Sequence, residues 1–317
     1  MGELAALIAA LNWSLVSVAL TSLSSRTSPV VLSGLRLSTA VFVLPFVLLI
    51  SGQYGDITGA SWTAIVAMVG SGLIGYGLGD TMYIQALKLE GLQRTFPITT
   101  ALFIGLTVVG GIVVLGESFT WGLPTGAALI GAGVYAIVVP GRGRGRLQPV
   151  VGIAEPALST LGELREERPT ARGRLANAQG YLLMIGTGIV WATATLWLAQ
   201  GRKELGAVAA GSLRVPAGAV ALVAFAFATQ RDALAAPFRD RRHIGAIILA
   251  GLAGTAFGSM LYVYAVGEAG AARTAVLNAT APVMGLPLSV LFLGERLTRR
   301  VVLGTLVCVA GIILVVS

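Results

Sequence analysis

Cysteine and histidine occur once each in this chain of 317 residues, and only 11% of its residues are charged. One cysteine excludes an intramolecular disulfide, and one cysteine with one histidine excludes a metal site built from a cluster of these residues. The sequence also lacks the cluster of carboxylates, histidines or a nucleophile with its base that an active site would require. We therefore predict no catalytic residues, no bound metal, no cofactor and no enzymatic activity.

Apolar residues make up 56% of the chain, and its mean hydropathy is +0.85. A soluble domain could not bury so much apolar surface. Segments of about 20 apolar residues cross a bilayer as helices. Ten such segments cover most of the sequence: 4–22, 30–50, 62–87, 95–115, 121–139, 180–199, 208–229, 244–266, 274–293 and 301–316. A membrane β-barrel is disfavoured, because its strands are only about half this length. We predict an all-α, polytopic membrane protein with ten transmembrane helices.

The second half of the sequence repeats the first at an offset of 178 or 179 residues. The matched pairs include Trp13 with Trp191, Arg36 with Arg214, Tyr83 with Tyr262, and Glu117 with Glu295. Each repeat contains five predicted spans, and an odd number makes the second repeat enter the membrane from the opposite side. We predict two inverted five-helix repeats at 1–139 and 180–317, joined by a basic linker at 140–179.

Two pairs of segments carry a resemblance to a known family. They are GLGDTMYIQALKLEGLQRT with FGSMLYVYAVGEAGAART, and LGESFTWGLPTGAALIGAGV with LGERLTRRVVLGTLVCVAGI. Together with the five-plus-five layout, they resemble EamA-type repeats of the drug/metabolite transporter superfamily, over essentially the whole chain outside the linker. The resemblance implies export or exchange of small metabolites. It also implies a central cavity lined by the fourth and ninth helices and parts of the first, third, sixth and eighth, with the fifth and tenth outside it.

Three ionisable side chains stand out within the predicted spans: Arg36, Asp80 and Arg214. Charge at this depth is costly unless it is paired, hydrated or extended to the interface. Arg36 and Asp80 lie at similar depths from one membrane face, so we expect them to pair and to act in coupling, with Asp80 accepting a proton when the pair separates. Ser259 stands where the repeat would place a second aspartate, which leaves Arg214 to meet an anionic group of the substrate. The structural alternative is that the arginines extend to the interface and the pair fixes helix packing.

Other candidates for substrate binding are aromatic and polar side chains inside the spans. With Arg214, they are Asn12, Trp13, Tyr83, Thr99, Thr100, Trp191, Tyr262, Asn278 and Thr280. The two tryptophans lie in the middle of their spans, away from the interfacial positions that tryptophan prefers. Pro97 and Pro282 free backbone carbonyls near the polar groups, and such carbonyls are tolerated where they line a cavity. Helix packing is the alternative role for all of these residues.

Glu117 and Glu295 each stand just before a predicted helix, where a carboxylate interacts favourably with the helix N-terminus. Both are therefore predicted to be structural. Gly122 and Gly126 lie in the fifth span and are candidates for the contact of a homodimer, since small residues allow helices to approach closely.

Basic residues indicate how the chain sits in the cell membrane, which we expect to be a prokaryotic cytoplasmic membrane. The loops on one side hold 17 of the 22 lysines and arginines. The positive-inside rule then places the central loop 140–179 in the cytoplasm and both termini outside, whereas the family resemblance implies the reverse. The net charge of +8 is explained by this bias and does not indicate nucleic-acid binding.

These observations predict a secondary active transporter, an exporter or exchanger of small metabolites such as amino acids or organic acids, working by alternating access. No ATPase signature is found, so ions or exchange would drive transport. The expected partners are a small-molecule substrate, the lipid bilayer and protons. The main alternative is a facilitative exchanger without proton coupling. A non-transporting sensor or scaffold and an intramembrane lipid-modifying enzyme are less favoured, because the first would be expected to carry a soluble output domain and the second an acid–base cluster.

Overall fold

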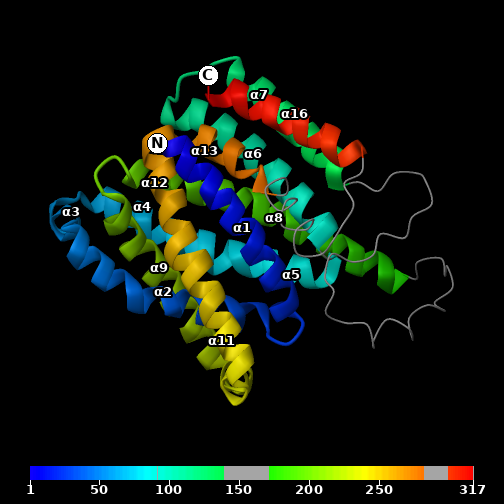
Figure 1. Cartoon of the computed structure of the whole chain (residues 1–317). Coiled ribbons are helices and arrows are strands. Elements are labelled where there is room, and N and C mark those ends of the chain that lie inside the picture. Colours follow the sequence, from blue (N-terminus) through cyan, green and yellow to red (C-terminus); the bar gives the residue numbers. More distant parts are fainter. Residues whose placement is uncertain (91, 139–170, 282–298, 317) are drawn as a thin grey trace.

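The computed structural model describes residues 1–90, 92–138, 171–281 and 299–316, and these ranges contain helices and no strand. Figure 1 shows the helices gathered into one bundle. The first repeat contains α1 (Gly2–Ser24), α2 (Pro29–Ser51), α3 (Tyr54–Gly59), α4 (Trp62–Gly72), η1 (Leu73–Gly79), α5 (Asp80–Glu90), α6 (Leu92–Leu115) and α7 (Gly122–Val138). The second contains α8 (Ala171–Gly201), α9 (Ala207–Thr229), α10 (Arg231–Ala235), η2 (Ala236–Arg239), α11 (Arg241–Ala250), η3 (Gly251–Gly258), α12 (Ser259–Ala269), α13 (Ala271–Asn278) and α16 (Arg299–Val316).

Local sequence signals set several helix ends. Ser28 and Ser61 cap α2 and α4 by accepting hydrogen bonds from backbone N–H groups of the first turn, and Asp240 does the same for α11. Such caps satisfy donors that have no partner within the helix. Gly52, at a φ of +69°, ends α2 in the left-handed conformation that glycine adopts without strain. The long helices therefore begin and end close to the predicted limits.

Seven described helical stretches are long and apolar enough to cross a membrane: Gly2–Ser24, Pro29–Ser51, Trp62–Glu90, Ile98–Leu115, Ala178–Gly201, Ala207–Thr229 and Arg241–Ala269. They bear out the all-helical membrane fold. Helix α7 has 17 residues, α16 contains the shorter apolar stretch Leu306–Val315, and the predicted ninth span reaches into 282–298, outside the described residues. The count of ten stays a prediction. Most of the predicted linker also lies outside the described residues, but 171–179 already form the first turns of α8.

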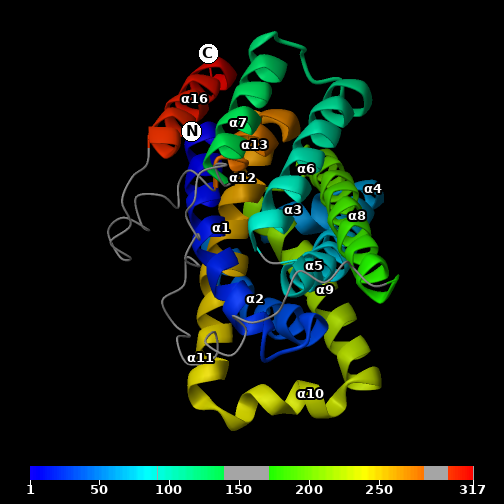
Figure 2. The ribbon, with the colours of Figure 1, turned by 90° about the vertical axis from the view of Figure 1, so that its right-hand side faces the viewer.

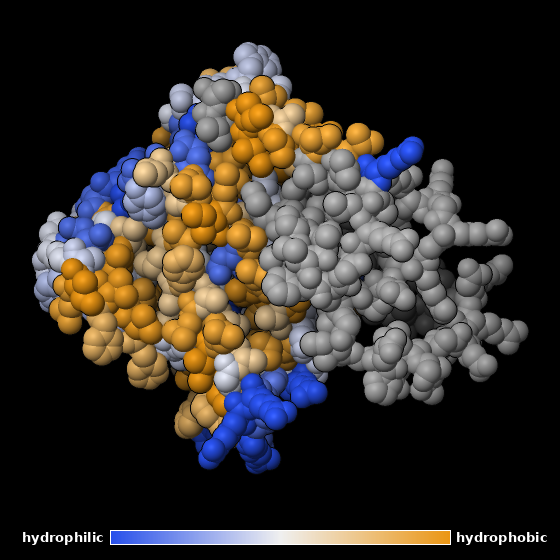
Figure 3. Space-filling view, in the orientation of Figure 1, coloured by the Kyte–Doolittle hydropathy of each residue, from blue (hydrophilic) through white to orange (hydrophobic). Residues whose placement is uncertain are grey.

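The outer surface of the bundle is apolar. Phe42, Phe46, Ile50 and Val113 expose between 68% and 86% of their surface, and hydrophobic surface covers much of the face in Figure 3. Hydrophilic residues gather at the lower end of that view, where Figure 1 places α11. An apolar surface with a polar end suits a protein whose sides face lipid.

The third and eighth spans contain a feature that the apolar pattern does not reveal. In the middle of each, the α-helix widens into a π-helix, η1 in the first repeat and η3 in the second. The N–H of Asp80 bonds to the carbonyl of Gly75, and the N–H of Ser259 bonds to that of Gly254, each five residues back. Because π-helical turns are rare and frequently occur at functional sites, these matched segments are the first structural pointer to a site.

The two repeats are packed into each other. Helix α2 packs against α9, α1 against α12, and α6 against α8, while α7 and α16 pack together (Figures 1 and 2). Glycines permit the closest approaches: a Cβ at Gly72 would overlap the backbone carbonyl of Arg214, and one at Gly251 would meet that of Arg36. These are equivalent contacts, made once by each repeat on the other.

Glycines of α7 are also used inside the chain. A Cβ at Gly122 would overlap the carbonyl of Leu314, and one at Gly126 would overlap Val315, both in α16. The prediction that these two glycines form the contact of a homodimer is therefore wrong, because α16 of the same chain already covers them. A homodimer through another surface stays a prediction.

The ends of α2 and α9 make matching contacts. The side-chain oxygen of Gln53, after α2, accepts hydrogen bonds from the N–H groups of Val208 (3.0 Å) and Ala209 (3.3 Å) at the start of α9. Ser28, before α2, donates its hydroxyl to Gln230 after α9 at 2.6 Å. The two helices therefore run in opposite directions, with contacts between the repeats at both ends. Each has 23 residues, so the contacts lie roughly 35 Å apart, near opposite faces of a bilayer.

Glu117 binds a helix N-terminus, although not that of the helix that follows it. One carboxylate oxygen accepts from the N–H of Ala271 at 2.6 Å and the other from Ala272 at 3.1 Å. The sequence predicted that Glu117 would interact with the N-terminus of α7, the helix that follows it. This prediction is wrong, because the carboxylate binds the N-terminus of α13, a helix of the other repeat. Glu295 lies outside the described residues.

Candidate functional site

A cavity lies at the centre of the bundle, between the two repeats. It leaves about 120 Å³ for the centres of water-sized molecules, which is room for several waters or for a small solute. The first repeat lines it with Ala9, Asn12, Trp13, Arg36, Gly75, Tyr76, Asp80, Thr100 and Phe103. The second lines it with Trp191, Ala194, Thr195, Arg214, Gly254, Thr255, Gly258, Ser259, Tyr262, Asn278 and Ala279. Neither α7 nor α16 contributes a lining residue.

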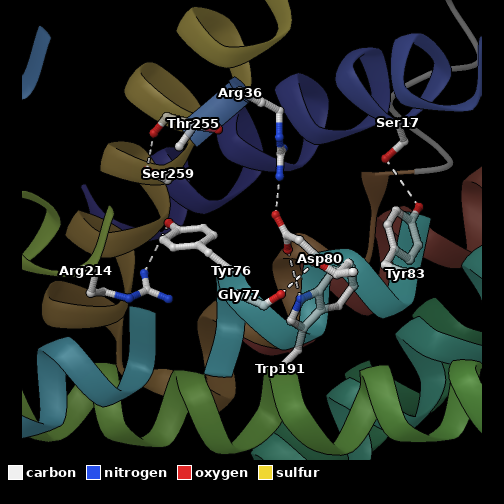
Figure 4. Close-up of polar contacts among 11 residues, drawn as sticks. Ser17, Arg36, Tyr76, Gly77, Asp80, Tyr83, Trp191, Arg214, Thr255 and Ser259 are labelled. Carbon is white, nitrogen blue, oxygen red and sulfur yellow. Dashed lines mark hydrogen bonds and ion pairs between the residues drawn. The ribbon is translucent and has the colours of Figure 1, made fainter. Parts of the chain in front are cut away.

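A buried ion pair forms one part of the cavity wall (Figure 4). Arg36 in α2 donates from Nη2 to Asp80 Oδ2 at the start of α5, and the two residues expose only 1% and 4% of their surface. Trp191 in α8 donates its indole N–H to the other carboxylate oxygen at 3.1 Å. Arg36 Nε is buried without a hydrogen-bond partner in the described part of the chain. The carboxylate of Asp80 thus depends on groups from both repeats.

Arg214 is the second buried cation of the cavity, with 4% of its surface exposed. Its guanidinium carbon lies 4.7 Å from the centre of the Tyr76 ring, and Nη1 donates to the Tyr76 hydroxyl at 3.4 Å. Among the described residues, no carboxylate lies within 4 Å of this guanidinium, and its Nε has no partner. Tyr76 therefore holds Arg214 in the cavity without neutralising its charge.

Aromatic rings form a second part of the wall. Trp191 lies at the centre of the group, with ring-centre distances of 5.7 Å to Trp13, 4.9 Å to Tyr83 and 6.4 Å to Phe103. The ring of Trp13 also lies 5.8 Å from that of Tyr83. Rings at these spacings pack favourably and give the cavity an apolar surface beside its charged groups.

Two tyrosines anchor the wall through equivalent hydrogen bonds. Tyr83 donates to the hydroxyl of Ser17 at 3.4 Å, and the hydroxyl groups of Tyr262 and Thr195 lie 2.9 Å apart. At the offsets of the repeat, Ser17 corresponds to Thr195 and Tyr83 to Tyr262. The repeat therefore extends to individual polar contacts.

A π-helical carbonyl is used directly beside the cavity. The side-chain amide of Asn12 donates to the carbonyl of Ala253 in η3 at 3.0 Å. A widened turn presents carbonyls that an α-helix would use internally, and here one of them ties α1 of the first repeat to η3 of the second.

Most of the residues that the sequence suggested meet at this cavity. Nine of them line it: Asn12, Trp13, Arg36, Asp80, Thr100, Trp191, Arg214, Tyr262 and Asn278. Tyr83, Thr99 and Thr280 are fully buried and do not line it. Tyr83 supports Trp13 and Trp191 from behind, and Thr280 donates to the carbonyl of Leu277 at 2.7 Å. The side chain of Pro97 and all of Pro282 lie outside the described residues.

Five lining residues with side chains suited to binding were missed by the sequence: Tyr76, Phe103, Thr195, Thr255 and Ser259. The repeat offset contained a signal for three of them, Tyr76, Thr255 and Ser259. It equates Tyr76 with Thr255 and Asp80 with Ser259. The third span and its counterpart, the eighth, therefore each place two polar side chains on the cavity. Phe103 carries no such signal, because its position in an apolar run looks like any other packing residue.

The chemistry available in this cavity is binding and proton exchange. A carboxylate that can lose its cationic partner is able to take up a proton, and a guanidinium without an acid is able to bind an anion. Within the described ranges, no three His, Cys, Asp or Glu side chains are gathered as they would be around a metal ion.

Two comparisons with known proteins give matches. The sequence model of the EamA-like transporter family matches residues 1–139 and 178–317. A solved structure described as "Crystal structure of protein" superposes with a TM-score of 0.71, over 99% of this chain and 96% of that chain, at 18% sequence identity. At this identity the likeness concerns the fold alone. No curated protein sequence matches the chain.

Proposed function

This chain belongs to the EamA-like transporter family, and from that membership we propose that it is a secondary active transporter of small metabolites, such as amino acids or organic acids. The family and the apolar helices make it a multi-pass membrane transporter of the drug/metabolite type. The finer proposal is that it exports or exchanges its substrate by alternating access. The observation that carries it is a solute-sized cavity between two repeats, with a charged wall and an aromatic wall.

Proton coupling is proposed to act through Asp80 and Arg36. Their ion pair is buried, with 1% of the surface of Arg36 and 4% of that of Asp80 exposed. Separating the pair would leave a buried charge, which is strongly unfavourable unless the carboxylate takes up a proton. Because Trp191 of the other repeat also binds this carboxylate, movement of one repeat against the other would disturb the pair and so link protonation to conformation.

Alternating access is supported by the matched contacts at the two ends of α2 and α9. Gln53 holds the repeats together at one end and the Ser28–Gln230 bond holds them at the other. A cavity in the middle of such a pair becomes accessible from one side when the contact at that end opens. We propose that the two contacts open alternately.

The proposed orientation follows the basic residues. Arg239, Arg241 and Arg242 are exposed at the end where α9, α10 and α11 meet. In the topology predicted from the sequence, this end lies on the same side as the central loop. The positive-inside rule places this end in the cytoplasm and both termini outside. The membrane is proposed to be the cytoplasmic membrane of a prokaryote.

Facilitative exchange without protons is the second candidate. It is favoured by the Arg36–Asp80 pair if this pair stays closed through the cycle and only fixes the packing of α2 against α5. Both candidates use the same cavity. They differ in whether the Asp80 carboxylate takes up a proton during the transport cycle.

The test is flux into sealed liposomes that contain the purified protein, with pools of amino acids and small organic acids, beside Asp80→Asn. The proposal expects substrate flux with proton movement in the wild type, and loss of proton movement in the variant. Flux without proton movement in both proteins would support exchange. If no pool moves, the proposed substrate class is wrong.

A further inference from the structure

The two repeats build the same polar arrangement around the cavity, with one residue exchanged. In the first arrangement Arg36 and Trp191 bind the carboxylate of Asp80. At the repeat offsets, the counterparts are Arg214, Trp13 and Ser259. The helices are placed alike as well, since α9 packs against α12 as α2 packs against α5, and α1 packs against α12 as α8 packs against α5. The second arrangement therefore has the cation and the indole in place.

What the second arrangement lacks is its acid. Ser259 is shorter than aspartate and uncharged, and its hydroxyl donates to the carbonyl of Thr255, one turn back in η3. Arg214 is nine-tenths buried or more, with Nε unpartnered, and the described residues offer it the ring and hydroxyl of Tyr76 but no carboxylate. Nor does a described residue accept a hydrogen bond from the indole N–H of Trp13. A desolvated cation without an anion is unfavourable, so this position is prepared for an anion from outside.

We infer that the substrate supplies the missing carboxylate. Resting on the transport function proposed above, its carboxylate occupies the space that a second Asp80 would fill, between Arg214 and Trp13 and beside Ser259. Bound substrate thus completes the symmetry of the two arrangements. The one-residue difference between the repeats makes one arrangement the internal charge pair and the other the binding site.

The same geometry narrows the class of substrate. Arg36 is neutralised by Asp80, so Arg214 gives the described lining of the cavity one uncompensated positive charge. A single carboxylate balances that charge, whereas a second one would be desolvated without a partner. The rings of Trp13, Trp191 and Phe103 offer an apolar surface next to it. The substrate class is therefore a monocarboxylate with an apolar body.

The experiment measures ligand binding rather than transport. Purified wild-type protein in detergent is titrated with aromatic and short aliphatic monocarboxylates, each beside its uncharged primary amide, and binding is followed by tryptophan fluorescence and thermal shift. The wild type is expected to bind at least one acid about tenfold or more tightly than its amide, the discrimination of a charge-assisted hydrogen bond.

The decisive variant is Ser259→Asp, which places an internal carboxylate beside Arg214. Its affinity for that acid is expected to fall by about tenfold or more. Ser259→Asn, whose side chain has the size of aspartate but no charge, is expected to keep the preference for the acid over its amide. Arg214→Gln is expected to lose the preference too, and it provides the test if Ser259→Asp does not fold.

Three results would overturn the inference: acids and amides bind equally, no acid in the panel binds, or the acid binds undiminished to both Ser259→Asp and Arg214→Gln. These failures are distinct from failure of the transport proposal. Transport of an uncharged or cationic solute into liposomes would leave the transporter standing and remove the carboxylate site alone.

Discussion

Trp191 in the second repeat donates its indole N–H to Oδ1 of Asp80 in the first repeat, across a distance of 3.1 Å. The other oxygen of this carboxylate is bound by Arg36. A single carboxylate is thus held from both sides of the boundary between the repeats. Any relative movement of α8 and α5 changes the environment of the one buried acid that lines the described cavity.

Trp191→Phe removes this hydrogen bond and keeps an aromatic ring in the wall. Since a hydrogen bond to a charged group contributes about 1.5–3 kcal/mol, we expect the rate of proton-coupled flux to change by about tenfold or more, with the protein still folded. Trp197→Phe, the same substitution on the same helix but away from the cavity, is the control. Equal flux in both variants would show that the bond has no part in coupling.

Close packing at the π-helices is tested by adding one methyl group. Gly72→Ala and Gly251→Ala each force a Cβ against a backbone carbonyl of the other repeat, and overpacking of this kind costs about 1–3 kcal/mol. Both variants should lower the unfolding temperature in detergent. Gly77→Ala is the matched control, because nothing lies within 4 Å of its added Cβ. If Gly77→Ala is as destabilising as the other two, the close approach is not the cause.

Glu117 should contribute to stability through α13. Glu117→Ala removes the acceptor of two N–H groups at the start of this helix, and we expect a loss of about 1–2 kcal/mol. Glu117→Gln should lie between the wild type and alanine, because it keeps one oxygen and loses the charge. Thermal unfolding measures the effect, with Glu268→Ala, half exposed at the end of α12, as the control. A larger loss for Glu268→Ala would contradict the assignment.

The sequence predicted the helices and much of the cavity for a clear physical reason. The length of an apolar segment can be read from neighbouring residues alone. The repeat offset identifies Arg214 as the counterpart of Arg36 without any knowledge of contacts. The depth of Arg36 and Asp80 in their spans was enough to predict that they would pair, and the structure contains this pair.

What the sequence did not reveal depends on turn geometry and on contacts between distant segments. The π-helical turns at Gly75 and Gly254 rotate the residues that follow, and hydropathy does not report such a rotation. Tyr76 was missed for this reason. Glu117 was assigned to the wrong helix because its partner, Ala271, is 154 residues away. Tyr83, one residue of the aromatic group, was placed in the cavity although it packs behind it.

The contacts at the two ends of α2 and α9 should have opposite effects on sidedness. Gln53→Ala weakens the closure at the end where α9 begins, and Gln230→Ala weakens it at the end where α9 stops. We expect the first variant to favour opening on the side of the termini and the second to favour the other side. Substrate uptake from each side of oriented vesicles reports this bias. A shift in the same direction for both variants would contradict the assignment of one closing contact to each side.

If one cavity opens in turn to both sides of the membrane, a residue that lines it must become accessible from each side. Ala194 lines the cavity and exposes 2% of its surface, and Cys308 is the only cysteine of the chain. A protein with Ala194→Cys and Cys308→Ser therefore carries one reporter thiol, to be labelled by a membrane-impermeant maleimide from either side of sealed vesicles. Alternating access predicts labelling from both sides, slowed from both by bound substrate. Labelling from one side only, under every condition, would contradict it.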